Sequence, residues 1–135
     1  MEKKWILAFA HVRGGNERGH DWHQAATKLN KLKSIEDLLS CTQYLIANGF
    51  THPSLLSAMG SSAGATTLAA AVNMRPDLFK SVILSAPFLD MLGSLSDKDL
   101  PLTVSDYEEF GNPVADPKVF DYIHSYSPYF VVFNI

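Results

Sequence analysis

Three short stretches of the chain are almost continuously apolar and are bounded by turn residues. Residues 5–12 read WILAFAHV and stop at two glycines, residues 55–59 lead into a glycine–serine element, and residues 81–86 are closed by Pro87. Apolar runs of this length are typical of strands that are buried on both faces of a parallel sheet. We therefore predict a strand in each of the three stretches.

Between the first two stretches, the apolar positions follow a helical period. Ser34 is placed to cap this helix, with Asp37 three residues on as the returning carboxylate. The dipeptide Asn48-Gly49 predicts a left-handed end, and Cys41, which lies on the same helix, is predicted to pack in the core. The predicted buried face consists of Ile35, Leu38, Leu39, Thr42, Leu45 and Ile46.

A second helix is predicted at Ala63–Met74, where the residues are small and apolar and Pro76 bars any continuation. After Pro87 the chain becomes irregular and acidic, with two short helices expected near 105–110 and 117–126. The alternation of strands and helices predicts an α/β fold, a parallel sheet of about three strands with helices on both faces. Three strands are few for such a sheet, so we expect it to be incomplete.

Composition narrows the class of protein. The formal net charge is −3, so nothing in the charge favours binding to nucleic acid or to an anionic membrane. The sequence has no stretch of 18 consecutive apolar residues, so it predicts no membrane span. The apolar run after the basic start is too short for a signal peptide. A single cysteine excludes an internal disulfide and a thiolate zinc site and suits the reducing cytosol. We expect a cytoplasmic globular protein.

The segment GSSAG carries the main candidate chemistry. Only Ser62 has glycine at both −2 and +2 (Gly60 and Gly64), the pattern of a nucleophile elbow on a strand–turn–helix. Side chains at these two positions are expected to collide as strand and helix turn back on each other. The backbone N–H of Ala63 is the expected donor to an oxyanion. The alternative is a tight strand–helix turn whose small residues serve only close packing.

Several longer blocks, in order along the chain, carry a resemblance to a known family. They are AHVRGGNERGHDWH, GSSAGA, NMRPDLF, APFLDML, PLTVSDYEEFGNP and YSPY. From about Ala8 to Tyr129 the chain resembles the prolyl oligopeptidase family, most of all its oligopeptidase B and prolyl endopeptidase-like branch. The family usually has G-G-S-x-G-G at the nucleophile, and Ser61 and Ala65 replace two of those glycines here.

The resemblance implies a catalytic domain of the α/β-hydrolase fold, preceded in the complete enzymes by a β-propeller. It implies a serine hydrolase of short peptides that needs no metal and no other cofactor. Residues 1–135 would then be an incomplete domain that lacks the propeller and the C-terminal part.

Residue by residue, the resemblance makes Ser62 the nucleophile and the Ala63 amide one oxyanion donor. Asp106 and Glu108 match the two acids with which oligopeptidase B grips a basic side chain at the cleavage position. In the prolyl endopeptidase-like branch similar acids accompany esterase or thioesterase chemistry. The alternative for both acids is a helix first turn, where carboxylates favour the positive end of the dipole.

The general base is the missing part. In α/β-hydrolases the acid and the histidine follow the serine along the chain, and the only histidine after Ser62 is His124. The family's acid and histidine lie beyond the matched region, so we expect the chain to be inactive alone. The pair His20 and His23 has the spacing to share a metal, but no third ligand accompanies it.

Two hypotheses about the function therefore remain open. The chain is either part of such an enzyme, with a short peptide or ester as substrate, or an interaction fragment that self-associates through exposed sheet edges. A phosphate-binding loop at RGGNERG is weak, because the segment lacks the G-K-[ST] ending of a P-loop.

Overall fold

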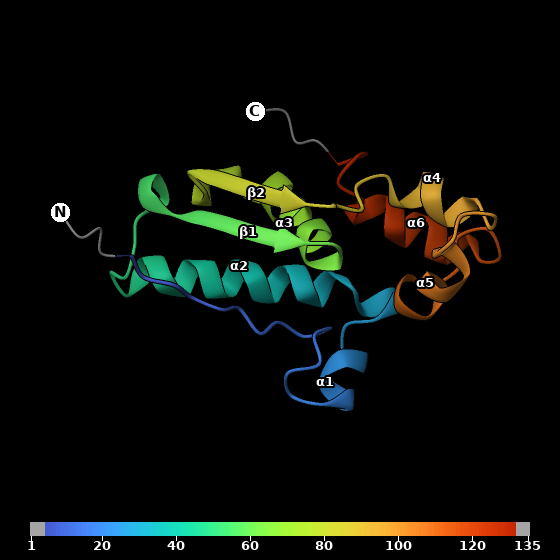
Figure 1. Cartoon of the computed structure of the whole chain (residues 1–135), viewed down its shortest axis with the longest axis horizontal. Helices are drawn as coiled ribbons and strands as arrows, with labels where there is room; N and C mark the ends of the chain where they lie inside the picture. Colours follow the sequence, from blue (N-terminus) through green and yellow to red (C-terminus); the bar gives the residue numbers. More distant parts are fainter. Residues whose placement is uncertain (1–4, 132–135) are drawn as a thin grey trace.

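The computed structural model describes residues 5–131 and consists of a small parallel sheet with helices (Figure 1). In chain order the elements are α1 (His20–Gln24), η1 (Lys28–Asn30), α2 (Leu32–Ala47), η2 (Pro53–Leu55), β1 (Ser57–Ser61), α3 (Ala63–Met74), η3 (Pro76–Leu78), β2 (Ser81–Ser85), α4 (Met91–Ser96), α5 (Thr103–Phe110) and α6 (Pro117–Tyr126).

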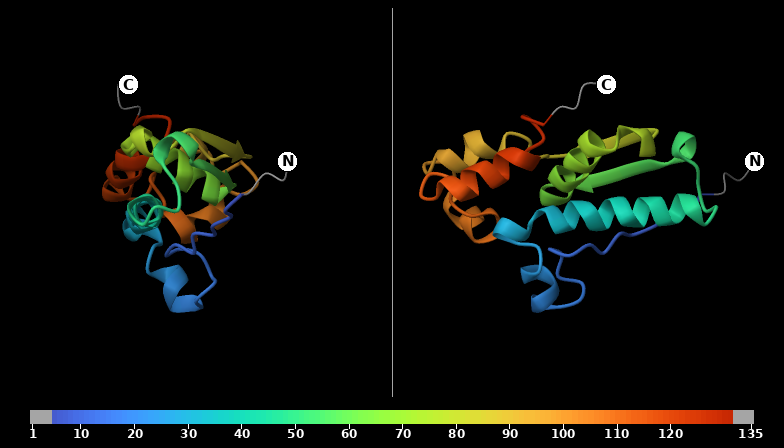
Figure 2. Two further views of the ribbon diagram at one scale, coloured as in Figure 1. Left: turned by 90° about the vertical axis from the view of Figure 1, so that its left-hand side faces the viewer. Right: turned by 180° about the vertical axis from the view of Figure 1, so that it is seen from behind.

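The sheet consists of β1 and β2, which pair in parallel from Ser57↔Ser81 to Ser61↔Ser85. The crossover between them is α3, whose small residues allow it to lie close against one face of the strands (Figure 2). On the other face Met59 and Ile83 are 71% and 59% exposed. Helices on both faces were predicted, but within residues 5–131 only one face is covered.

The predicted first strand is wrong. Residues 5–12 run in the same direction as β1 but form no ladder with it (Figure 1). Trp5, Ile6, Leu7 and Phe9 are between 67% and 80% exposed. A strand is stabilised by hydrogen bonds to a neighbouring strand, and within the described residues this apolar run has no such neighbour. The sheet therefore has two strands instead of about three.

The long helix α2 forms as predicted, but its start differs. It begins at Leu32, and Ser34 does not cap it: the Ser34 hydroxyl donates to the Arg13 carbonyl oxygen at 2.6 Å. The Asp37 carboxylate accepts from the Arg13 backbone N–H at 2.9 Å and from its guanidinium at 2.8 and 2.6 Å. Both side chains therefore hold the loop of residues 13–15 against the helix. The predicted end is confirmed, with Gly49 at φ 73°.

Cys41 does not pack in the core as predicted, because its side chain lies on the exposed side of α2. The six predicted face positions of the helix are all buried or half-buried.

The hydrophobic core lies among the helices and not at the sheet. It joins α2 and α3 to α4, α5 and α6, which gather at one end of the molecule (Figure 1). The two helices predicted after Pro87 are confirmed as α5 and α6, while α4, capped by the Asp90 carboxylate, was missed. The core residues are Ile35, Ala70, Ala71, Met91, Leu92, Leu95, Phe110, Val119, Ile123 and Tyr126.

None of the helices in the described part of the chain is long and apolar enough to cross a membrane.

The position of the core predicts unequal effects for two isoleucines. Ile123 is fully buried, and Ile123→Ala should lower the free energy of unfolding by about 2–5 kcal/mol, the usual cost of a large-to-small change in a core. Ile83→Ala, on the open sheet face, should change it by less than about 0.5 kcal/mol. Chemical denaturation measures both. A larger loss at Ile83 would mean that this face is covered in solution.

The Arg13–Asp37 pair predicts an acid-sensitive contribution to stability. The hydrogen bonds from Arg13 lower the pKa of Asp37 below its ordinary value of 3.8. The stabilisation is therefore fully present above about pH 4 and is lost as the pH falls further. Asp37→Asn should be less stable than wild type at neutral pH, and this difference should shrink in acid. Asp121→Asn, which removes an exposed carboxylate on α6, is the control. A constant difference across the acid range would contradict the assignment.

Candidate active site

Ser62 occupies a strained turn between the end of β1 and the start of α3. Its backbone has φ 51° and ψ −124°, in the left-handed half of the map that residues with a Cβ rarely adopt. The Ser62 N–H donates to the Ser85 carbonyl oxygen at 3.0 Å, so the turn is tied to the end of β2. The residue itself is exposed. This is the geometry of a nucleophile elbow, which presents a serine hydroxyl above the end of a strand.

The two flanking glycines differ in their role. A Cβ on Gly60 would lie 2.6 Å from the Gly64 carbonyl oxygen and 2.9 Å from the Ala65 nitrogen, which is closer than real contacts allow. A Cβ on Gly64 would meet nothing within 4 Å. The predicted collision is therefore confirmed at Gly60, whereas at Gly64 the described part of the chain leaves open space.

Free amides lie beside the Ser62 turn. Ala63 is the first residue of α3, and the N–H groups of Ala63 and Gly64 have no backbone acceptor within residues 5–131. Unpaired N–H groups at a helix start carry partial positive charge and favour an anion. An oxygen that acquires negative charge next to the Ser62 hydroxyl would find the Ala63 donor within the same turn.

His124 forms no hydrogen bond with the serine. Among the described residues, no histidine or carboxylate forms a hydrogen bond with the Ser62 hydroxyl, and His124 lies on the exposed side of α6. Its ring packs against Phe120 and Phe130, with centroids 6.4 and 5.1 Å away. Within residues 5–131 the Ser62 hydroxyl is therefore exposed and has no hydrogen-bonded histidine beside it.

Other histidines have local structural contacts. His52 caps η2 by accepting from the Ser54 N–H at 3.2 Å, and the His23 Nε2 lies 2.9 Å from a Glu109 oxygen. Within residues 5–131 no group of three or more histidine, cysteine, aspartate or glutamate side chains is arranged to hold a metal ion.

The two acids predicted to bind a basic side chain both lie on α5, but on different sides of it. Residues two apart on a helix do not face each other, and Asp106 is half-buried whereas Glu108 is exposed. The acid that shares the face of Asp106 is Glu109, three residues on. Burial, and next the charge of Glu109, raise the pKa of Asp106 above 3.8. The structure does not bring Asp106 and Glu108 together.

Glu109 is a structural residue that sequence reasoning missed. One of its carboxylate oxygens accepts from the Lys31 ammonium and the other contacts His23. Lys31 is almost fully buried, and its ammonium also lies 5.2 Å from the centre of the Phe110 ring. The cluster joins the segment before α2 to α5. Nothing in the acidic stretch distinguishes Glu109 from Glu108, so only the fold shows which acid is paired.

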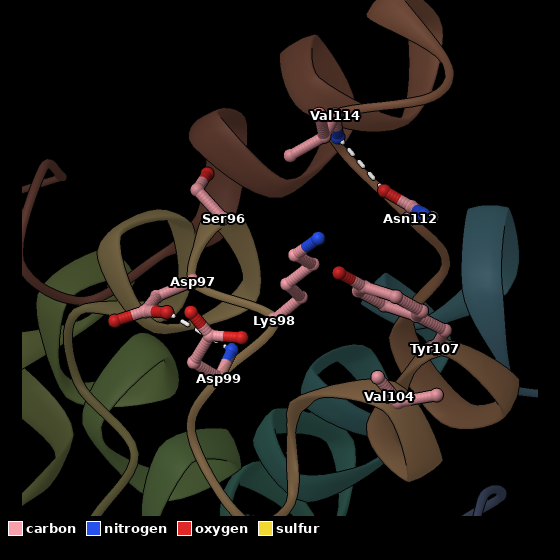
Figure 3. Close-up of a pocket in the computed structure, with 8 residues that line it drawn as sticks. All are labelled: Ser96, Asp97, Lys98, Asp99, Val104, Tyr107, Asn112 and Val114. Atoms are coloured by element: carbon pink, nitrogen blue, oxygen red, sulfur yellow. Dashed lines mark hydrogen bonds between the residues drawn. The ribbon is translucent and has the colours of Figure 1, made fainter.

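A hollow of about 500 Å³ lies between the end of α4 and α5 (Figure 3). The Lys98 side chain reaches into it, toward Tyr107 and Asn112 (Figure 3). Neither Asp106 nor Glu108 lines it. Its lining residues are Ser96, Asp97, Lys98, Asp99, Val104, Tyr107, Asn112 and Val114.

The chain is similar to known peptidases over nearly its whole length. It is 45% identical over 129 residues to a "Prolyl endopeptidase-like" protein of Homo sapiens. The alignment covers 96% of this chain and 18% of that protein. It is 36% identical to "Dipeptidyl aminopeptidase BI" of Pseudoxanthomonas mexicana, again over 96% of this chain and 18% of the relative. The chain thus spans less than a fifth of the length of these relatives.

The fold agrees with solved structures. Oligopeptidase B from Trypanosoma brucei, with covalently bound antipain, superposes with a TM-score of 0.87 at 42% identity, covering 90% of this chain and 17% of that one. Oligopeptidase B from Leishmania major gives a TM-score of 0.86 at 40% identity. Over the matched part, the chain therefore has the α/β-hydrolase fold of these enzymes, here with two strands.

Residues 1–134 match the prolyl oligopeptidase family. Together with the relatives and the superpositions, this match shows that the chain belongs to the prolyl oligopeptidase family, whose members are serine peptidases.

Proposed function

We propose that Ser62 is the nucleophile of a serine-type hydrolase and that the Ala63 amide is one of its oxyanion donors. The observation that carries this proposal is the left-handed backbone of Ser62 at the junction of β1 and α3, with its N–H bonded to Ser85. A glycine would adopt this conformation without strain, whereas a serine there costs about 1–3 kcal/mol, so the packing of the turn gives no reason for a serine in place of a glycine. Presenting the hydroxyl beside free helix N–H groups gives such a reason, because attack on a carbonyl puts negative charge there.

The base belongs, in this proposal, to polypeptide outside residues 5–131. A serine hydroxyl needs a histidine, itself held by a carboxylate, to accept its proton. The relatives are more than five times longer than the chain, which leaves ample sequence for both groups and for a propeller domain. The chain alone should turn over little or no peptide or ester, since nucleophile and base act as a unit.

For the substrate, we propose short peptides that are cleaved after a basic residue, with Asp106 as the main contact of the basic side chain. Asp106 is the half-buried acid of α5, and a partly desolvated carboxylate forms stronger charge-assisted hydrogen bonds with a guanidinium than an exposed one does. Glu108 reaches the same side chain only from the outer side of the helix. The relatives named as oligopeptidase B are consistent with peptide substrates.

A second candidate is ester or thioester hydrolysis by the same serine. The hollow beside α5 combines Lys98 with Asp97 and Asp99, and its lining also includes Val104 and Val114, so it is compatible with a neutral acyl group. A third is an interaction fragment that pairs through the free edges of β1 and β2, next to the exposed Met59 and Ile83. As part of the main proposal, we place the protein in the cytosol.

Labelling with a fluorophosphonate tests the nucleophile. Ser62 should label slowly, because no described base activates it, and its rate should rise by about tenfold per pH unit without levelling near neutral pH. Mass spectrometry of the labelled peptide and the rate between pH 6 and about pH 9 measure this.

Ser61→Ala is the matched control and should label like wild type, whereas Ser62→Ala should not label. A rate that levels off near pH 7, the range of histidine, and falls in His124→Ala would show that His124 serves as base after all.

Binding of benzamidine tests the acids of α5. Asp106→Asn should weaken it by roughly tenfold, while exposed Glu108→Gln should weaken it by less than about threefold. Because the pKa of Asp106 is raised, binding should begin to weaken at a higher pH than an ordinary aspartate would give, as the solution is acidified. NMR titration across the acid range measures both. Equal losses in the two variants would contradict the assignment.

A further inference from the structure

Two strained turns lie side by side at the carboxyl ends of the two strands. Ser62, after β1, has φ 51°, and Ala86, after β2, has φ 45°. Neither is a glycine, so each conformation costs about 1–3 kcal/mol and persists only where its surroundings fix it. The backbone bond from Ser62 N–H to Ser85 oxygen joins the two turns directly.

Thr66 is the side chain that bonds across these turns. It lies one helical turn after Ser62 and is 4% exposed. Its hydroxyl donates to the Phe88 carbonyl oxygen at 2.9 Å and accepts from the Phe88 N–H at 3.2 Å. Its backbone N–H donates to the Ser62 carbonyl oxygen at 3.1 Å. One residue therefore holds the segment after Ala86 against the first turn of α3.

The neighbouring Thr67 shows what an ordinary threonine does at this place. Its hydroxyl donates to the Ala63 carbonyl oxygen at 3.0 Å, within its own helix, and makes no bond to the segment after β2. This local bond is common in helices and fixes nothing outside them. The Thr66 hydroxyl also lies 3.4 Å from the carbonyl oxygen four residues earlier, that of Ser62, but only Thr66 bonds in addition to the segment after β2.

We propose that Thr66 is a positioning residue for the Ser62 nucleophile: its hydroxyl locks the segment at Phe88 to the elbow and so holds the Ser62 turn. Thr66 does not itself touch the substrate. This inference rests on the proposed role of Ser62. Removing the hydroxyl leaves the Phe88 N–H and carbonyl without their partner in a partly buried place, and they regain hydrogen bonds only if the segment moves toward water.

The test compares Thr66→Val, which keeps the shape and loses the hydroxyl, with Thr66→Ser, which restores it, and with Thr67→Val as the matched control. Amide hydrogen exchange by NMR is the first readout. In Thr66→Val the Phe88 and Ser62 amides should exchange roughly tenfold faster, while Ala70 in the same helix stays unchanged. Thr66→Ser and Thr67→Val should both keep the wild-type rates.

The second readout is fluorophosphonate labelling of Ser62, which should fall by roughly fivefold in Thr66→Val alone. If wild-type Ser62 never labels, the proposed function fails. The exchange rates then still show whether the Thr66 hydroxyl holds the Phe88 segment and the Ser62 turn together. If Thr66→Val does not fold, NMR of the wild-type protein provides the test. The Thr66 hydroxyl proton should exchange with water slowly enough to be observed, and it should give a cross-peak to Phe88. Wild-type exchange in Thr66→Val, an equal effect in Thr67→Val, or a rapidly exchanging hydroxyl proton would each overturn the proposal.

Discussion

The close backbone approach at Gly60 is the constraint on which the site depends. Strand β1 and helix α3 turn back on each other so tightly that a side chain at Gly60 would meet the backbone of Gly64 and Ala65. This approach forces the intervening Ser62 into a left-handed conformation, exposes its hydroxyl, and leaves the first N–H groups of α3 beside it. The proposed nucleophile and the proposed oxyanion donor therefore lie in one turn of the backbone.

In the described part of the chain, the Ser62 turn is held mainly by the packed helices and only slightly by the sheet. The core packs α2 and α3 against α4, α5 and α6, and the Lys31–Glu109 pair joins the segment before α2 to α5. The sheet contributes the Ser85 acceptor but little buried surface, because one of its faces carries the exposed Met59 and Ile83. The elbow is thus fixed mainly through its helix and through the segment that follows β2.

Much of this was predictable from the sequence because it depends on local chemistry. The period of α2, the small residues of α3 before Pro76 and the glycine spacing around Ser62 each identify an element without knowledge of its neighbours. What failed depends on partners that are distant in the chain. Residues 5–12 have the composition of a strand, but a strand needs a neighbour to pair with.

Dependence on distant partners also explains why predictions for single residues within the helices were wrong. Ser34 and Asp37 have the spacing of a capping box, yet Arg13 provides a stronger partner for both. Asp106 and Glu108 look alike in sequence, and the helix turns them to different sides with different burial. Cys41 falls between the buried positions of α2, where a shift of one residue around the helix decides exposure. Thr66 and Thr67 are indistinguishable until the Phe88 segment is placed.

The most direct test of the central claim is a crystal structure of the chain after reaction with a fluorophosphonate. We predict a phosphonyl group on the Ser62 oxygen, with its P=O oxygen accepting a hydrogen bond from the Ala63 N–H and the turn retained at positive φ. An adduct on Ser61, or a phosphonyl oxygen that points away from Ala63, would contradict the account, because the turn would then lack the arrangement that makes Ser62 a nucleophile.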